Sequence, residues 1–164
     1  MTTASIPDAP TTGLLDDGAL ARVCVIVLAG VHLALHVENV REVIVFEDVT
    51  AVPLAPPHVV GAANLRGTVV PIVDARSLLS LPGGPATRRH RTLMVSAGGL
   101  EAALVIENVV SLEGLGEILP VDPAAGLRHA EWASGFLRRD NQLVPLIDVA
   151  KLLSALRPQA GTAA

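Results

Sequence analysis

The sequence predicts a mainly β protein, built from two small related β-barrels packed together, with short helices and a helix near the C-terminal end. Many short apolar stretches, separated by Gly, Pro, Asn and Asp, follow one another at the close spacing of short strands. Hydrophobic residues make up 51% of the 164 positions but aromatic residues only 2%, and Tyr is absent. The core must therefore be aliphatic, which favours strands packed through branched side chains.

One apolar stretch occurs twice in the chain. The segment V-V-P-I-V-D at 69–74 returns as L-V-P-L-I-D at 143–148, 74 positions later, and a Leu-Leu pair follows both copies. An earlier block that begins at Gly30 and contains E-N-V at 38–40 returns at Gly99 and 107–109, 69 positions later. A constant offset with one small change between blocks is typical of an internal duplication. We therefore expect two related halves.

The first half begins with a Thr-, Pro- and Ala-rich segment, residues 1–20, that lacks periodicity and is predicted to be a flexible tail. Strands are then expected at 23–28, 31–37, 40–46 and 69–73, with a Pro-rich connection at 49–57 and a small-residue turn that starts at Gly61. Pro71 removes one backbone donor, so its strand is predicted to lie at an edge or bulge. Asp74 is expected to cap a short helix that carries Leu78 and Leu79.

A cluster of Pro and Gly at 81–85 separates this half from the second. Further strands are expected at 91–97, 99–106, 109–112, 132–137 and 143–148, with hairpin turns at Gly98-Gly99 and Asp140-Asn141, and then a helix at 149–156. The domain is expected to span 21–156, with one subdomain at about 21–82, a second at about 86–156, and strand exchange between them left open. Residues 157–164 form a second predicted tail.

Composition narrows the class of protein. The formal net charge of −4 argues against a surface devoted to nucleic acid. Cys24 is the only cysteine and lies among aliphatic residues, so it is predicted to be a buried thiol in a reducing compartment. The most apolar stretch, 23–37, is interrupted by His32 and His36 and is shorter than the roughly 20 residues of a membrane span. No signal peptide is recognised, so we expect a cytoplasmic protein without membrane insertion.

Three groups of polar residues invite a chemical interpretation. His32 and His36 have a zinc-like spacing, but on a strand they lie about 13 Å apart and no third ligand accompanies them. The basic cluster at 88–91 suits a phosphate or an acidic partner, although a solvated loop is the simpler interpretation. Asp74 and Asp148 are candidates for acid–base work, but their duplicated positions favour helix capping.

The remaining motifs do not point to an enzyme. The sequence contains no G-x-S-x-G, Walker A or G-x-G-x-x-G motif, and its polar groups do not converge on one reaction. We therefore expect no catalytic residue, no cofactor and no bound metal. A small hydrolase or metal-dependent enzyme that uses Asp74, Asp148 or the histidines is the competing class.

Arg66 stands apart from these groups. It follows a small-residue turn, precedes a buried strand, and has no carboxylate within four positions. Two interpretations are left open. Arg66 is an ordinary surface residue, or it is an exposed cation positioned to pair with a carboxylate of a partner.

With these residues identified, the chain resembles the CheW-like chemotaxis coupling proteins from about Arg22 to Leu156. The most specific part is G-x-x-N-L-R-G-x-x-x-P-I-x-D at 61–74, and the second half supports it with the L-I-D-x-x-x-L-L pattern that ends at Leu153. The resemblance implies two five-stranded SH3-like subdomains and a cytoplasmic, non-enzymatic adaptor. It would join the cytoplasmic domains of methyl-accepting chemoreceptors to the regulatory domain of a CheA-type histidine kinase, in clustered receptor arrays.

The resemblance also assigns surfaces. It implies that the positions that contact the receptor, or support that contact, are Val40, Glu42, Gly61, Asn64 and Arg66. The first subdomain would join one kinase face, the second would make the main kinase contact, and other CheW-like proteins are further expected partners.

Four features depart from the family pattern. They are Leu33 where a Tyr is usual, Ala103 where a Gly is common, a short Gly-rich connection at 113–128, and two cations in the turn segment 137–141. Because most of them lie in the half expected to bind kinase, an accessory protein that binds or organises receptors without engaging the kinase is the alternative function.

Overall fold

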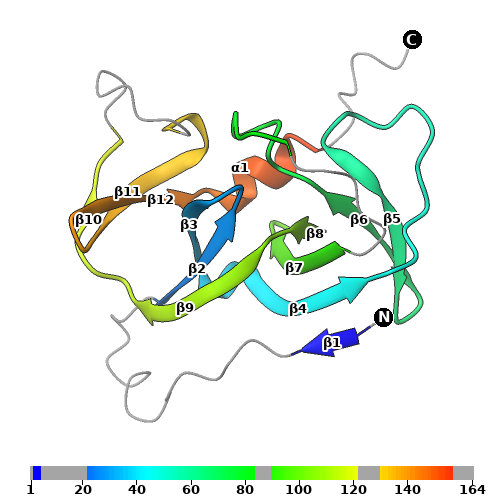
Figure 1. The fold of residues 1–164 in the computed structure, drawn as a ribbon, viewed down its shortest axis with the longest axis horizontal. Helices are drawn as coiled ribbons and strands as arrows, with labels where there is room; N and C mark the ends of the chain where they lie inside the picture. Colours follow the sequence, from blue (N-terminus) through cyan, green and yellow to red (C-terminus); the bar gives the residue numbers. More distant parts are fainter. Residues whose placement is uncertain (1, 5–21, 84–89, 122–129, 157–164) are drawn as a thin grey trace.

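Two β-sheets lie side by side in the structure, a computed structural model that describes residues 2–4, 22–83, 90–121 and 130–156 (Figure 1). The first sheet has the strand order β1 (Thr2–Ala4), β4 (Val40–Phe46), β7 (His90–Ala97), β8 (Leu100–Val105), β6 (Thr68–Val73) and β5 (Val59–Leu65). The second has the order β10 (Ile118–Leu119), β11 (Ala133–Arg139), β12 (Gln142–Ile147), β3 (Val31–His36), β2 (Arg22–Leu28) and β9 (Asn108–Gly114). Two 3₁₀ turns, η1 (Val37–Asn39) and η3 (Ala130–Trp132), and the helix α1 (Val149–Ser154) complete the described elements.

The expected fold class is confirmed: the chain is mainly β, with two sheets and a short C-terminal helix. Each sheet has six strands rather than five, because the short strands β1 and β10 each add to one edge. Thr2–Ala4, which the sequence assigns to the tail, pairs with β4. No described helix is both long and apolar enough to cross a bilayer.

The two sheets exchange hairpins. The β7–β8 hairpin of the second half lies in the first sheet, and the β2–β3 hairpin of the first half lies in the second sheet. Each exchanged hairpin is joined to its host sheet by a parallel pairing, Ile72 with Ala103 in one sheet and Leu146 with Ala34 in the other. These pairs are related by the 74- and 69-residue offsets of the sequence repeat, so the duplication is preserved in the backbone.

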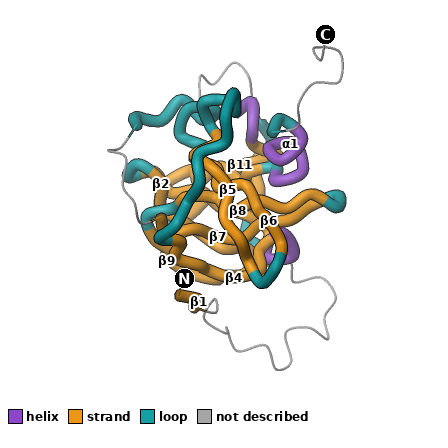
Figure 2. Tube along the Cα trace, turned by 90° about the vertical axis from the view of Figure 1, so that its right-hand side faces the viewer, coloured by secondary structure: helices purple, strands orange, loops and turns teal. Residues whose placement is uncertain are grey.

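The core has three parts. A small cluster fills each sheet, one around Ile44, Ile72 and Met94, the other around Val25 and Leu146. The largest cluster lies between the sheets and receives side chains from both, together with the buried face of α1. Figure 2 shows α1 at the upper edge of the molecule, and the helix contacts β7 and β8 of the first sheet. Because each sheet contains strands from both halves of the chain, the packing of this shared cluster holds the two halves together.

Most expected strands are present within one or two residues, and both predicted hairpin turns have the positive φ angles that tight turns need. Three strands were missed: β1, β10 and β5. The stretch around Gly61 was expected to be a turn, because Gly and Ala have a low strand propensity. Pairing with β6 overrides that propensity, and the stretch belongs to β5.

The predicted helix after Asp74 is wrong. Residues 75–80 form irregular turns in which Leu79 N donates to Ala75 O at 2.9 Å, and Ser80 has a φ of 56°, which a helix does not tolerate. The duplicate segment behaves as predicted: Asp148 accepts a hydrogen bond from Lys151 N at 3.1 Å and caps α1.

Pro71 was expected at an edge or a bulge, yet β6 is an interior strand. Pairing of β6 with β8 covers only Ile72 and Val73, so Pro71 lies just beyond that ladder. The missing N–H therefore removes no hydrogen bond that the parallel pairing needs.

Candidate functional site

The turn between β5 and β6 carries the cation that the sequence singled out. Arg66 and Gly67 occupy its two central positions, with φ angles of 51° and 87°. Two consecutive positive φ angles are typical of the type I′ turns that close tight hairpins. The side chain of Asn64 accepts a hydrogen bond from Gly67 N at 2.9 Å and holds the turn closed. The backbone thus places Arg66 at an exposed hairpin tip.

Glu42 of β4 pairs with Arg66 through a two-pronged ion pair. Arg66 donates from Nη1 to Oε1 at 2.6 Å and from Nη2 to Oε2 at 2.9 Å, the planar geometry in which guanidinium and carboxylate match best. The hydrogen bond from Arg66 lowers the pKa of the Glu42 carboxyl below its usual value, so the pair is ionised at neutral pH. The Arg66 side chain is 58% exposed and that of Glu42 only 20%, so the cation is more accessible to a partner than the carboxylate that holds it.

The expectation that no neighbour neutralises Arg66 is therefore correct only along the sequence. The fold brings in a carboxylate from 24 positions away. Glu42 reaches the turn beside a bulge in β4, where the pairing with β7 shifts between Val40 and Val43. The result is a cation that is held in one orientation but remains accessible, because more than half of the Arg66 side chain is exposed to solvent.

A shallow cavity of about 320 Å³ runs beside the ion pair. Its lining comes from five strands and the hairpin tip and mixes charged with apolar side chains: Arg41, Glu42, Leu65, Arg66, Thr68, Val70, Met94 and Glu101. A surface of this kind suits a partner that offers an apolar ridge flanked by charges.

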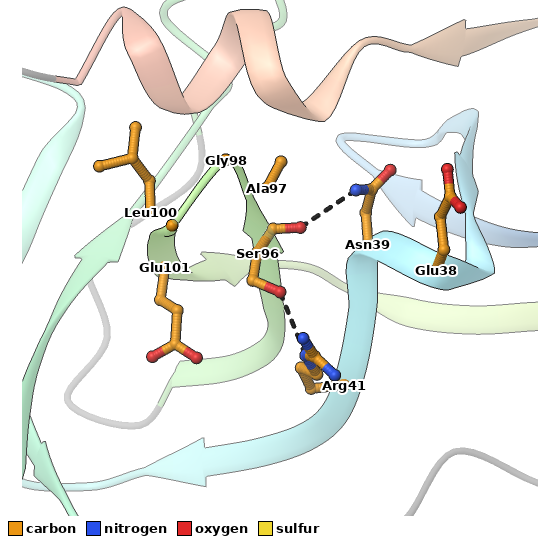
Figure 3. Close-up of a pocket in the computed structure, with 9 residues that line it drawn as sticks. Glu38, Asn39, Arg41, Ser96, Ala97, Gly98, Leu100 and Glu101 are labelled. Carbon is orange, nitrogen blue, oxygen red and sulfur yellow. Dashed lines mark hydrogen bonds between the residues drawn. The ribbon is translucent and has the colours of Figure 1, made fainter.

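A second cavity, of about 450 Å³, adjoins the first and shares Arg41 and Glu101 with it. Two hydrogen bonds of 3.1 Å join lining residues of this cavity to Ser96 of β7. Asn39 Nδ2 donates to Ser96 O, and Arg41 Nε donates to Ser96 Oγ (Figure 3). Glu38 and Glu101 line the cavity but point in different directions in Figure 3. They therefore do not form a carboxylate pair of the kind that acid–base chemistry uses.

The five residues expected at a receptor surface do not share one environment. Glu42, Asn64 and Arg66 lie together at the hairpin and its neighbouring strand. Val40 is only 9% exposed and packs in the cluster between the sheets. Gly61 is buried, and a Cβ built there would lie 2.4 Å from the Thr50 carbonyl oxygen. Val40 and Gly61 are thus buried, whereas the other three are at least partly exposed at the hairpin.

The remaining chemical candidates are accounted for separately. Asp74 forms an ion pair with Arg76, with Nη2 2.5 Å from Oδ2, whereas Asp148 caps α1. His32 and His36 lie on β3, and the described part of the chain brings no three metal-binding side chains together. Within the basic cluster at 88–91, residues 88 and 89 lie outside the described residues, while Arg91 donates to the Glu107 carbonyl at 3.1 Å.

Three further lining residues lie outside the 61–74 motif and were not singled out by the sequence: Arg41, Met94 and Glu101. Met94 and Glu101 belong to the exchanged β7–β8 hairpin, so their place beside Arg66 depends on the exchange. Arg41 falls within the strand expected at 40–46, and no sequence pattern gives it a separate role. Its neighbour Glu42 could be identified from the sequence, because it falls at a contact position that the family resemblance implies.

Comparison with known proteins extends this picture. Residues 22–157 match the family model described as the CheW-like domain. The chain is 26% identical over 131 residues to a probable chemotaxis protein CheW of Rhizobium etli, a match that covers 79% of this chain and 84% of the relative. It is 24% identical to chemotaxis protein CheW of Bacillus subtilis, covering 80% and 86% of the two chains. It is also 29% identical to protein FrzA of Myxococcus xanthus, covering 79% and 82%.

A solved structure shares the fold. The crystal structure of the scaffolding protein TtCheW from Thermoanaerobacter tengcongensis superposes with a TM-score of 0.69 at 24% identity. The match covers 79% of this chain and 89% of that protein, so nearly the whole of that structure has a counterpart here.

Proposed function

As the chain belongs to the CheW-like family, we propose that it is a non-enzymatic adaptor that links the cytoplasmic tips of chemoreceptors to a CheA-type histidine kinase. It would act in the cytoplasm, clustered with the receptors in a chemosensory array. The observation that carries the receptor half of this proposal is the exposed Arg66–Glu42 pair at the β5–β6 hairpin tip.

The ion pair is suited to recognition rather than to chemistry. Because Arg66 is already oriented by Glu42, a partner carboxylate meets a cation that has little side-chain freedom left to lose. Such a carboxylate replaces or joins Glu42, so the net gain is modest and the contact mainly determines which partner fits and in what register. The apolar members of the adjoining cavity, Leu65, Val70 and Met94, would receive the apolar face of a receptor helix.

Contacts of this size are individually weak. In a lattice, each adaptor binds a receptor on one surface and a kinase on another. The first contact raises the effective concentration for the next, so weak contacts together give a stable association. We therefore propose that the hairpin surface binds the receptor and that the second subdomain, about 86–156, makes the main kinase contact, with other CheW-like proteins as further neighbours.

The first test is a calorimetric titration of the purified protein with a receptor cytoplasmic-tip fragment from the same cell. Arg66→Glu is expected to weaken binding by about tenfold or more, since it places two carboxylates against the partner's own. Arg66→Asn removes the charge without adding repulsion and suits the positive φ of the turn, so it separates loss of recognition from loss of folding.

Arg138→Glu is the matched control, because Arg138 is also 58% exposed and lies in the equivalent hairpin of the second sheet. It is expected to leave receptor affinity unchanged. Receptor binding that is equally strong in the wild type and in Arg66→Glu would refute the assignment of this surface.

The alternative is an accessory protein that binds or organises receptors without the kinase. It is motivated by the departures in the second half, which include the pair of cations at the end of β11. In the structure each of these cations faces an acidic side chain: Arg138 lies 3.5 Å from Glu117, and Arg139 lies 3.2 Å from Glu113. The second sheet thus presents less uncompensated charge at this position than the sequence suggests. A separate titration with the kinase regulatory domain decides between the two functions, since measurable binding removes the accessory one.

A further inference from the structure

The four sheet edges of the described chain are protected to different degrees. Two of the edge strands are very short, β1 with three residues and β10 with two. The edge of β5 is covered by the preceding loop, where Thr50 and Ala62 exchange backbone hydrogen bonds of 2.9 and 2.8 Å. β9 is different: it is seven residues long, and no described strand pairs with its outer side.

The side chains of β9 give it little protection. Exposed edges are usually guarded by charged residues or proline, which discourage pairing with another chain. β9 has one charged residue, Glu113, and its carboxylate is occupied by Arg139 at 3.2 Å and by Ser111 Oγ at 2.7 Å. The strand ends at Gly114, which is exposed, and Val110 remains 40% exposed. A local register shift near Val110 is the one guarding feature.

The equivalent edge in the first sheet shows which kind of segment can pair with such a strand. β4 is the counterpart of β9 at the 69-residue offset, and each pairs on its inner side with the first strand of an exchanged hairpin. On its outer side β4 is covered by β1, which pairs antiparallel so that Thr2 lies opposite Val45 and Ala4 opposite Val43. The same offset places the equivalent positions of β9 at 112–114.

We propose that the outer edge of β9, centred on Leu112–Gly114, binds a short extended segment of a partner protein as an added antiparallel strand. The occupant is an uncharged segment of small and β-branched residues, like the Thr-Thr-Ala that covers β4, and its affinity comes chiefly from backbone hydrogen bonds. This surface is distinct from the Arg66 hairpin and does not depend on the receptor proposal.

A second copy of this chain is the less suitable occupant. Each copy has two equivalent edges, on β4 and β9, but its described residues include only one N-terminal strand to cover them. Exchange of that strand between copies would uncover one edge for every edge that it covers. A segment from another protein has no such cost, so the strand count favours a heterologous partner.

The test uses the whole ¹⁵N-labelled protein and an acetylated, amidated peptide of residues 1–6, M-T-T-A-S-I, as the probe. In a titration followed by amide chemical shifts, the expected changes concentrate at Asn108–Gly114, and hydrogen exchange slows at the same amides. Changes confined to Val43–Val45 would show that the peptide only replaces β1, and they would overturn the proposal.

Two lysine substitutions make the test specific. Val110→Lys places a charge on the edge strand and is expected to weaken peptide binding by about tenfold. Val69→Lys is the matched control, because Val69 is 70% exposed but belongs to the interior strand β6, and it should bind the peptide as the wild type does. Val110→Thr, which keeps a neutral branched side chain, should also bind normally.

Three other results would refute strand addition at β9. Amides of β9 that exchange slowly in the protein alone would mean that another part of the chain covers the edge. Shift changes at β9 that depend on protein concentration without peptide would identify a second copy as the occupant. Equal binding by Val110→Lys and the wild type would place the peptide elsewhere.

Discussion

His58 is a buried histidine that lacks a complete set of hydrogen bonds. It is 9% exposed, and its Nε2 has no partner within the described part of the chain. Burial lowers the pKa of the imidazole below its ordinary value of 6.5, because the charged form loses hydration without gaining a compensating contact. At neutral pH, His58 in the folded protein is therefore in its neutral form.

This lowered pKa makes stability dependent on pH. Between the folded pKa and 6.5 the unfolded chain binds more protons than the folded one, so the free energy of unfolding decreases as the pH falls below 6.5. Urea midpoints measured from about pH 7.5 to about pH 5 should decline in the wild type. His58→Asn should flatten that decline, whereas His32→Asn, at a partly exposed position of β3, should retain it. Identical slopes in all three proteins would rule out this role for His58.

At the scale of elements, two strands need glycine because another strand or loop passes close to them. A Cβ at Gly61 in β5 would meet the Thr50 carbonyl oxygen at 2.4 Å, whereas one at Gly135 in β11 would meet a methyl group of Ile118 at 2.6 Å and the Leu119 oxygen at 3.0 Å. The two glycines are 74 positions apart and occupy equivalent places in the duplicated fold. The requirement is thus a property of the repeated architecture.

The identity of the obstructing atom sets the expected cost of a methyl group. Gly61→Ala must displace backbone and should destabilise the protein by about 1–3 kcal/mol. Gly135→Ala should cost less, since the Ile118 side chain can rotate away. Gly116→Ala, with nothing within 4 Å of its Cβ, is the control and should be nearly neutral. Chemical denaturation of the three variants measures this order, and a reversed order for Gly61 and Gly116 would contradict the packing described here.

At the scale of the whole molecule, the exchanged hairpins make each half dependent on the other. The first sheet lacks β7 and β8 without the second half, and the second sheet lacks β2 and β3 without the first. The largest buried cluster also draws residues from both halves. The subdomains near 21–82 and 86–156 are therefore repeats of the sequence, and we expect neither to be an independent folding unit.

Fragments test this dependence. A chain of residues 1–86 and one of residues 87–164 should each lack a cooperative unfolding transition, since each exposes the apolar surface that the missing hairpin covers. Co-expression of the two should restore a complex with the circular dichroism of the intact protein. A cooperative transition in either isolated fragment would show that a half closes its own sheet.

Much of this architecture could be read from the sequence because it depends on local chemistry. Turn residues at Gly98-Gly99 and Asp140-Asn141, alternating apolar strands and the Asp148 cap follow from backbone preferences of a few consecutive residues. The same kind of local signal misled at Gly61 and after Asp74. There, strand pairing and an irregular turn override propensity, and only the folded chain supplies those partners.

The sequence by itself determined that the chain is mainly β, that it is duplicated, that it carries an N-L-R-G motif and that it resembles one family. Tertiary structure alone decided that Glu42 faces Arg66, that Val40 is buried and that the β7–β8 hairpin lines the cavity beside them. The physical reason is sequence separation. Local preferences extend over a few residues, whereas these contacts join segments tens of positions apart, whose approach is set by sheet pairing and by the packing of the shared core.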